Sequence, residues 1–482
     1  MSFIPYRSNP QFVLPPRVGD FIPQDDLCWV TAEVVDMLDL SGIKGKYSDY
    51  GTNGYHPGML LKLVLYGVAT GHRSSRKLAR LAAFDVRGIM LCGGLRPAWR
   101  TINRFIADNY DEVRDLFCQV LKICKELGLV GFGHLAIDGT KVKAAASKNK
   151  NKTIDRLEKD LAKLKEEIGR ALTEIRANDE QENDDELPQE LKDKAKRKKK
   201  IEQAIIELKA RQQEESDSKA ELRHNETDPD SRLMRTSRNG YQQCYNHQVA
   251  VDTETNVITA YGTSQDASDI NQMQPTLKAS EANTGQKHKA ASADTGYFSG
   301  ENLDYLKKEE IDGHVCPERE AGAYHKSKFV YNEECDLYVC PAGRELSYVE
   351  TKKKQAGKAV RIYSGDCSGC PHQKACVKSK TGNRQVERDQ YDHLREEMRE
   401  KLKTDRGKTV YGRRKETVEP VIGQLKMRQD FTQHHRKGLK AAGAEFGLIC
   451  LAHNLKRIWH KYKDCQGARA ALNVLVALEC SS

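Results

Sequence analysis

The chain has 482 residues, of which 38% are hydrophobic and 31% charged, and its formal net charge is +10. Its longest apolar runs, 63–70 and 470–478, are far shorter than the ~20 residues that cross a bilayer, which excludes an integral membrane protein. Recurrent aliphatic periodicity excludes a wholly disordered chain, and the length predicts several domains at roughly 100–200 residues each.

The charge is unevenly spread along the chain. Residues 153–215 hold 15 basic and 18 acidic side chains, a net charge of −3, so the remainder carries +13. A basic remainder suits a polyanionic partner, although general solubility would explain it equally well. The start of the chain has no long apolar stretch of the kind that directs secretion. The 14 cysteines are therefore expected to be free thiols, metal ligands or nucleophiles in a reducing compartment.

The first 128 residues are expected to be helical. Apolar stripes predict helices at 26–40, 56–70 and 101–127. Pro57 suits the first turn of the second helix, and Ser74 or Ser75 can cap a further one. Basic side chains gather at the turns of this region, where they could contact a polyanion or simply form a solvated face. They are Arg73, Arg76, Lys77, Arg96, Arg100 and Arg104.

The character of the sequence changes after Gly131. Residues 134–138 form a short apolar run that ends in Asp138, and an alternating stretch follows Gly139, which predicts two strands or one long kinked strand. Apolar residues then recur every three or four positions through 154–175 and continue helically from 191 to 208. This pattern predicts an antiparallel helical hairpin inserted into another domain, where it serves as a spacer or as an interaction arm.

Residues 245–315 show an α/β pattern. Strands are predicted at 245–252, 257–262, 289–294 and 311–315, with helices at 273–283 and 301–310, the second capped by Ser299. Residues 316–389 are expected to be loop-rich, and helices follow at 390–403, 411–428, 439–462 and 470–478.

The loop-rich segment holds five cysteines between Cys335 and Cys376. A C-x-x-C pair with further cysteines on tight turns suits a tetrahedral zinc ion, whose thiolate ligands need short turn-forming spacings. The preferred ligands are Cys340, Cys367, Cys370 and Cys376, with Cys335 as an alternative. An iron–sulfur cluster or free thiols would also fit these spacings.

Two aspartates, Asp138 and Asp294, are predicted at the carboxyl ends of strands, where ligands bind in open α/β sheets. Converging carboxylates can bind two magnesium ions ~4 Å apart for phosphoryl transfer. Each aspartate alone could equally end a strand or cap a turn. Glu419 is a third candidate, seven residues before Lys426 on a helical face. Pro420 disfavours helix at Glu419, so the helix either begins near Thr417 or kinks there.

These residues lie in blocks that resemble the catalytic blocks of bacterial DDE insertion-sequence transposases. The blocks are Ala136-Ile-Asp138-Gly-Thr-Lys141, Ala293-Asp294-Thr-Gly-Tyr297 and Val418-Glu419-Pro-Val-x-Gly-x-Leu-Lys426. Residues 100–105 and 227–234 resemble flanking blocks of the same proteins, so the resemblance spans about 10–460. The branch with a Tyr-Arg-Glu-Lys signature is the most similar, and the cysteine-rich insert resembles the group numbered eleven eighty-two.

The resemblance implies an α/β fold, an RNase H-like mixed sheet flanked by helices, with an all-α N-terminal domain, a helical-hairpin insert and a cysteine-rich insert. The implied domains are a DNA-binding domain at 1–128 and a catalytic domain at 129–465, interrupted at 150–225 and 316–389, with a tail at 466–482. Asp138, Asp294 and Glu419 would bind two Mg²⁺ or Mn²⁺ ions. Asp138 would bridge both ions, and Lys426 would contact the DNA backbone.

The implied reaction cleaves transposon ends, releases a 3′-OH and joins it to target DNA by in-line phosphoryl transfer. Implied partners are the terminal inverted repeats, target DNA and a second copy of the chain on paired ends, in the cytoplasm at the nucleoid. The DNA-binding candidates are Arg73, Arg76, Arg100, Arg104, Lys141, Arg414, Lys415, Lys426 and Arg428. A catalytically silent DNA-binding regulator and an RNase H-like nuclease without strand joining remain alternatives.

One feature departs from the signature. The usual pattern has an arginine four residues before the glutamate, and here that position is Lys415, with Arg414 one residue earlier and Tyr411 displaced with it. A lysine can contact phosphate as a point charge but lacks the bidentate fork of arginine. The sequence alone therefore leaves open which of the two basic residues belongs to the site.

Overall fold

The computed structural model describes residues 17–47, 54–131, 133–178, 189–214, 222–236, 240–320, 322–354, 359–377, 379 and 382–464. The helix expected at 470–478 lies outside these residues. Within the described ranges, no helix is long and apolar enough to cross a membrane.

The N-terminal region is helical. A short 3₁₀ turn, η1 (Val18–Phe21), precedes α1 (Leu27–Met37), α2 (Ser41–Lys44), α3 (Pro57–Ala69), α4 (Ser75–Phe84), α5 (Val86–Leu91), α6 (Trp99–Asp108) and α7 (Glu112–Glu126). Ser74 caps α4 by accepting a hydrogen bond from the Lys77 backbone N–H, as its sequence position predicted. The single helix predicted at 101–127 is two helices, because the buried Asn109 side chain donates to the Phe105 carbonyl and ends α6.

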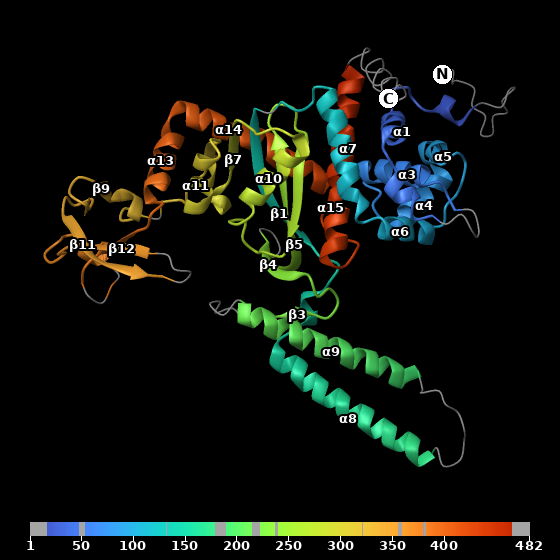
Figure 1. Ribbon diagram of the computed structural model, residues 1–482, viewed down its shortest axis with the longest axis horizontal. Helices are drawn as coiled ribbons and strands as arrows, with labels where there is room; N and C mark the ends of the chain where they lie inside the picture. Colours follow the sequence, from blue (N-terminus) through green and yellow to red (C-terminus); the bar gives the residue numbers. More distant parts are fainter. Residues whose placement is uncertain are drawn as a thin grey trace, which may run out of the picture.

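A mixed sheet forms the centre of the molecule (Figure 1). Its strands are β1 (His134–Lys143), β4 (Arg232–Thr236), β5 (Gly240–Asp252), β6 (Ile258–Ser264), β7 (Ala290–Ala293) and β8 (Asp312–Val315). β5 pairs antiparallel with β1, β4 and β6, whereas β7 lies parallel between β1 and β8. This is the RNase H-like arrangement, and β1 continues unbroken through Gly139.

Helices cover both faces of this sheet. Alternate side chains of β1 point to opposite faces, so Leu135 and Ile137 join one core and Ala136 and Val142 join the other. The first core includes α10 (Met273–Thr284) and α11 (Gly300–Lys308), with α13 (Asp392–Lys403) beside them. The second core includes α14 (Asp405–Met427) and α15 (Leu439–Asp464), and it is continuous with the core of the N-terminal helices.

The predicted helical hairpin projects away from the sheet (Figure 1). It consists of α8 (Ile154–Asn178) and α9 (Gln189–Glu214), and η2 (Lys148–Lys150) with the paired strands β2 (Asn151–Lys152) and β3 (His224–Asn225) forms its base. The apolar seam has a core of its own, in which Leu157 and Leu164 pack against Ile201, Ile205 and Leu208. The hairpin therefore buries its own apolar face.

The segment predicted to be loop-rich contains a second sheet. Five antiparallel strands follow η4 (Lys326–Lys328): β9 (Val330–Asn332), β10 (Leu337–Val339), β11 (Glu345–Lys353), β12 (Ala359–Ser364) and β13 (Gln385–Arg388). A short helix, α12 (Gln373–Cys376), lies between the last two strands. An aromatic core that includes Phe329, Tyr338 and Tyr363 holds this sheet together. The expectation of loops was wrong because three of the five strands span only three or four residues and the longest, β11, is exposed along nearly its whole length, so neither gives a clear alternation.

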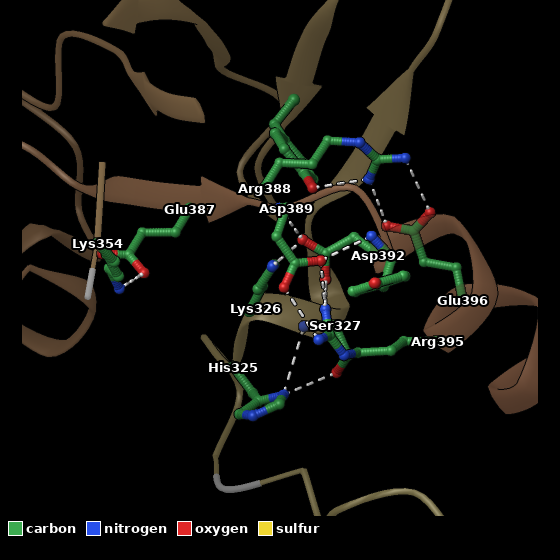
Figure 2. Close-up of polar contacts among 12 residues, drawn as sticks. His325, Lys326, Ser327, Lys354, Glu387, Arg388, Asp389, Asp392, Arg395 and Glu396 are labelled. Carbon is green, nitrogen blue, oxygen red and sulfur yellow. Dashed lines mark hydrogen bonds and ion pairs between the residues drawn. The ribbon is translucent and has the colours of Figure 1, made fainter. Parts of the chain in front are cut away.

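Ion pairs join this second sheet to α13 (Figure 2). Arg388, the last residue of β13, pairs with Glu396 at 2.8 Å. Arg395 pairs with Asp389 and Asp392 at 2.8 Å each, and Lys326 reaches the buried Asp392 at 2.6 Å. These contacts anchor the insert to the helix that leads directly into α14.

Candidate active site

The three acids predicted from the sequence lie on the central sheet and on α14. Asp138 is on β1 opposite Val249 of β5, and Asp294 follows β7, where its carboxylate accepts a hydrogen bond from the Gly296 N–H at 2.9 Å. Glu419 is on α14, which packs against β1, β7 and β8. The prediction that Asp138 ends a strand was wrong, because β1 stays paired with β5 as far as Lys143.

Arg414 joins two of these acids. Its guanidinium lies 3.0 Å from Asp138 and 3.0 Å from Glu419, and its side chain is almost completely buried. Lys415, the next residue of α14, is exposed to solvent. α14 runs through Pro420 without ending, so the alternative that the helix begins near Thr417 was wrong. The structure thus brings Arg414 rather than Lys415 into the site.

The site has an unfavourable concentration of negative charge. Burial raises the pKa of Asp138 to about 6, and it does so despite the opposing effect of Arg414. Burial also raises the pKa of Asp294, to which the neighbouring Asp269 and Glu419 add. Tyr411 lies close by, and burial together with a hydrogen bond to Cys316 raises its pKa. A carboxylate whose pKa is raised in this way is stabilised by an added cation.

The donor set fits divalent cations. All three acids offer carboxylate oxygens, the ligands that Mg²⁺ and Mn²⁺ prefer. Asp138 and Glu419 already share one cationic group, Arg414, so their carboxylates are close enough to share a charge. In the described part of the chain, no group of three or more His, Cys, Asp or Glu side chains is arranged so that it could hold a metal ion as it stands. Asp138 and Glu419 therefore lie near one another through Arg414 but do not form a metal-binding cluster by themselves.

A fourth carboxylate at the site was missed by the sequence analysis. Asp269, between β6 and α10, accepts hydrogen bonds from the Asn246 and Gln248 side chains of β5. The segment 265–272 has no periodic pattern, and nothing in its local sequence separates Asp269 from its neighbour Asp266. Only the pairing of β5 with β1 brings Asp269 to the catalytic end of the sheet.

The predicted DNA-binding residues fall into two groups. Arg76, Arg100 and Arg104 are exposed on α4 and α6, and Arg76 and Arg100 lie 5.1 and 5.3 Å from the ring of Trp99. Lys415 and Arg428 are exposed along α14 and its end, whereas Lys141 and Lys426 are half-buried. The second group comprises Arg73 and Arg414, whose guanidiniums are buried in ion pairs.

The position of Arg73 argues against the prediction that it contacts DNA. It pairs with Glu445 of α15 at 2.5 Å and donates to the carbonyls of Asp430 and Gln433. Glu445 in turn pairs with the buried His434 at 2.9 Å. Burial would raise the pKa of Glu445, but His434 and Arg73 outweigh it and bring that pKa to about 2. Arg73 thus joins the N-terminal helices to the core and leaves no guanidinium free for a phosphate.

Four of the five cysteines in the insert line one cavity of about 30 Å³. They are Cys340, Cys367, Cys370 and Cys376. The backbone N–H groups of Arg344 and Arg384 each donate to a sulfur, those of Cys340 and Cys367, at 3.3 Å. Burial raises the pKa of Cys376, and proximity to the other three thiols adds to the increase. Cys335 is exposed and does not line the cavity.

Comparison with known families agrees with this geometry. Residues 16–108 match the family described as transposase domain (DUF772), and residues 339–459 match the transposase DDE domain. The second match includes Arg414 and Glu419 but neither aspartate. No curated protein matches the chain.

The match to the transposase DDE domain supports an enzyme of the DDE class, a family that acts on DNA and uses divalent metal ions, and the RNase H-like sheet agrees with it. Together, the two family matches support an insertion-sequence DDE transposase.

Proposed function

We propose that this transposase binds terminal inverted repeats, cleaves the transposon ends and joins the released 3′-OH to target DNA with two Mg²⁺ or Mn²⁺ ions. The observation that carries the proposal is the Arg414 guanidinium between Asp138 and Glu419, with Asp294 electrostatically coupled to all three. Two bound cations would activate an oxygen nucleophile and stabilise the leaving oxygen.

The protein's own side chains divide the remaining tasks. Asp138, Asp294 and Glu419 would hold the cations, and the Asp138 carboxylate is more enclosed than that of Glu419. Arg414 keeps Asp138 and Glu419 together and limits their repulsion before a cation binds. Lys415 precedes Glu419 on α14, Lys426 follows it, and Arg428 lies just after the end of the helix. All three would contact the phosphates of the DNA that reaches the site.

A second surface, at the other end of the chain, would bind the inverted repeat. Trp99 is exposed, and the guanidiniums of Arg76 and Arg100 both lie over its ring, so the surface gathers positive charge around an aromatic side chain. Lys77 and Arg104 extend the basic character. Phosphate contacts would supply most of the affinity and would weaken steeply with salt. Two copies on paired ends, at the nucleoid, would complete the assembly.

Strand joining tests the proposal directly. A pre-cut transposon end and a supercoiled target plasmid are incubated with the protein, with and without Mg²⁺. We expect Mg²⁺-dependent joining by the wild type and none by Asp138→Asn, which keeps the shape of the side chain but removes its charge. Asp405→Asn is the matched control. Asp405 is fully exposed at the start of α14, so this variant should be fully active.

The same experiment separates the alternatives. Cutting without joining would identify an RNase H-like nuclease, and end binding with neither reaction would identify a catalytically silent regulator. Joining by Asp138→Asn at the wild-type rate would reject the assignment of the acids. Binding of the end by Asp138→Asn should stay close to that of the wild type, because Asp138 is remote from the basic surface on α4 and α6.

We also propose that the cysteine cavity binds a structural Zn²⁺ ion. The supporting observation is the enclosure of four thiols around a cavity of about 30 Å³, with backbone N–H groups directed at two of the sulfurs. Such N–H donors stabilise thiolates, which are the form that binds zinc. Elemental analysis of anaerobically purified protein should give one zinc per chain, and Cys367→Ser should lose it, whereas Cys335→Ser should retain it. Iron with acid-labile sulfide would indicate a cluster, and no metal would indicate free thiols.

A further inference from the structure

The glycines that follow the two catalytic aspartates have a common neighbour. A Cβ atom on Gly139 would lie 2.7 Å from Asp269 Oδ1 and 2.7 Å from Gln248 Nε2. A Cβ atom on Gly296 would lie 3.1 Å from Asp294 Oδ1 and 3.4 Å from Asp269 Oδ2. Neither glycine has a positive φ, so backbone conformation does not require them. Both leave room for the carboxylate of Asp269.

The strand register explains how Asp269 reaches this position. Gly139 is opposite Gln248, so the two residues share one face of the sheet, while Asp138 points to the other face. Asp269 fills the space beneath Gly139 on the α10 face. Its Oδ1 atom accepts hydrogen bonds of 2.7 Å from both Asn246 and Gln248, whose side chains are almost fully buried. The side chain is thus fixed on two rigid donors.

The network continues to the loop that carries Asp294. Tyr297, the last residue of the turn that follows Asp294, donates its hydroxyl hydrogen to Gln248 Oε1. Gln248 therefore connects Asp269 to the 3₁₀ turn η3 (Thr295–Tyr297), which Asp294 caps. Asn246 and Gln248 are neutral amides, so these hydrogen bonds do not neutralise the Asp269 carboxylate, which is near enough to Asp294 to help raise the pKa of that residue. The Asp269 carboxylate is therefore held in a fixed position near the end of the sheet where the cations would bind.

We infer that Asp269 is a positioning residue of the transposase site, which fixes the segments carrying Asp138 and Asp294 relative to one another and strengthens their hold on divalent cations. The inference rests on the proposed function, since it assumes that those acids bind the cations. Asp269 acts from behind Gly139 and Gly296 and is not assigned as a ligand itself. Partners of this kind, which orient the ligands of a metal, change metal affinity by roughly 10- to 100-fold when they are replaced.

Mn²⁺ binding to the full chain without DNA tests the inference. Free Mn²⁺ is followed by electron paramagnetic resonance during titration of wild type, Asp269→Asn and Asp266→Asn. We expect Asp269→Asn to bind Mn²⁺ about 10-fold or more weakly, because it keeps the size of the side chain and loses its charge. Asp266 is the matched control: it lies in the same loop, is exposed, and accepts a hydrogen bond from Gln272 instead. Its variant should bind as the wild type does.

Gly139→Ala supplies a second variant that retains Asp269. Its added methyl group must displace Asp269 or Gln248, so Mn²⁺ affinity should again fall, and this variant decides the question if Asp269→Asn does not fold. Wild-type Mn²⁺ affinity in Asp269→Asn, a lower melting temperature as its only effect, or no Mn²⁺ binding by the wild type would overturn the inference. Mn²⁺ binding as expected without strand joining would instead count against the proposed function alone.

Discussion

Replacement of Arg73 by alanine should destabilise the protein without removing a DNA contact. The Arg73 side chain is 2% exposed and bonds to Glu445 and to two carbonyls in the segment between α14 and α15. It also lies over the ring of Phe431 at 4.8 Å. Without Arg73, the buried Glu445 keeps only its contacts with the His434 ring and the His435 backbone N–H among those described. The contacts that join the N-terminal helices to the core are lost at the same time.

The depressed pKa of Glu445 gives the size of the effect. A change from 4.5 to about 2 corresponds to ~3 kcal/mol of stabilisation by its partners. Breaking a buried pair by removing one partner costs ~3–5 kcal/mol, which is of the same order. Arg73 supplies part of the first figure, but its two carbonyl contacts are lost as well, so we expect a cost of about 3 kcal/mol and a melting temperature roughly 3–5 °C lower.

Arg76→Ala is the paired control, because Arg76 lies only three residues further on, in the first turn of α4, and is exposed. Its unfolding free energy should stay within ~0.5 kcal/mol of the wild type, while its affinity for inverted-repeat DNA and the salt dependence of that affinity should fall. Urea denaturation and fluorescence anisotropy with labelled DNA measure the two quantities. Wild-type stability of Arg73→Ala combined with weakened DNA binding would refute the structural role and restore Arg73 as a DNA contact.

Three further predictions follow from individual contacts. The pKa of Glu445 is lower in the folded state, so its contribution is complete above the unfolded value of 4.5 and is lost as the pH falls towards about 2. Urea midpoints should therefore fall more steeply over that range in wild type than in Glu445→Gln, and parallel curves would contradict the assignment. Arg414→Ala should abolish end cleavage with little loss of end binding. Lys415→Ala should still cleave, and the slope of its DNA affinity against salt should fall by only about one released ion. The reverse result would make Lys415 the site residue. Leu164→Ala should destabilise the helical hairpin by ~2–4 kcal/mol and speed amide exchange there alone, and faster exchange in the central sheet would show that the hairpin has no core of its own.

Local patterns were sufficient to predict many elements of the fold. The Pro57 start of α3 and the serine caps of α4 and α11 lie within a few residues of the backbone groups that they position. The heptad spacing at 154–175 predicted α8 for the same reason, since both the signal and the structure repeat along one helix. The second sheet escaped prediction because its short strands are held by aromatic packing between segments that are distant in sequence.

The sequence by itself determined which acids are present, the glycines beside them and the basic, cysteine-bearing character of the chain. Only the tertiary structure decided what those residues do to one another. It buried Arg73 and Arg414, left Arg76 and Lys415 in solvent, and brought Asp269 close to Gly139 and Gly296. A guanidinium has the same charge wherever it stands in a sequence. Whether it binds a carboxylate or remains available to DNA depends on its burial and its neighbours, which long-range packing alone sets.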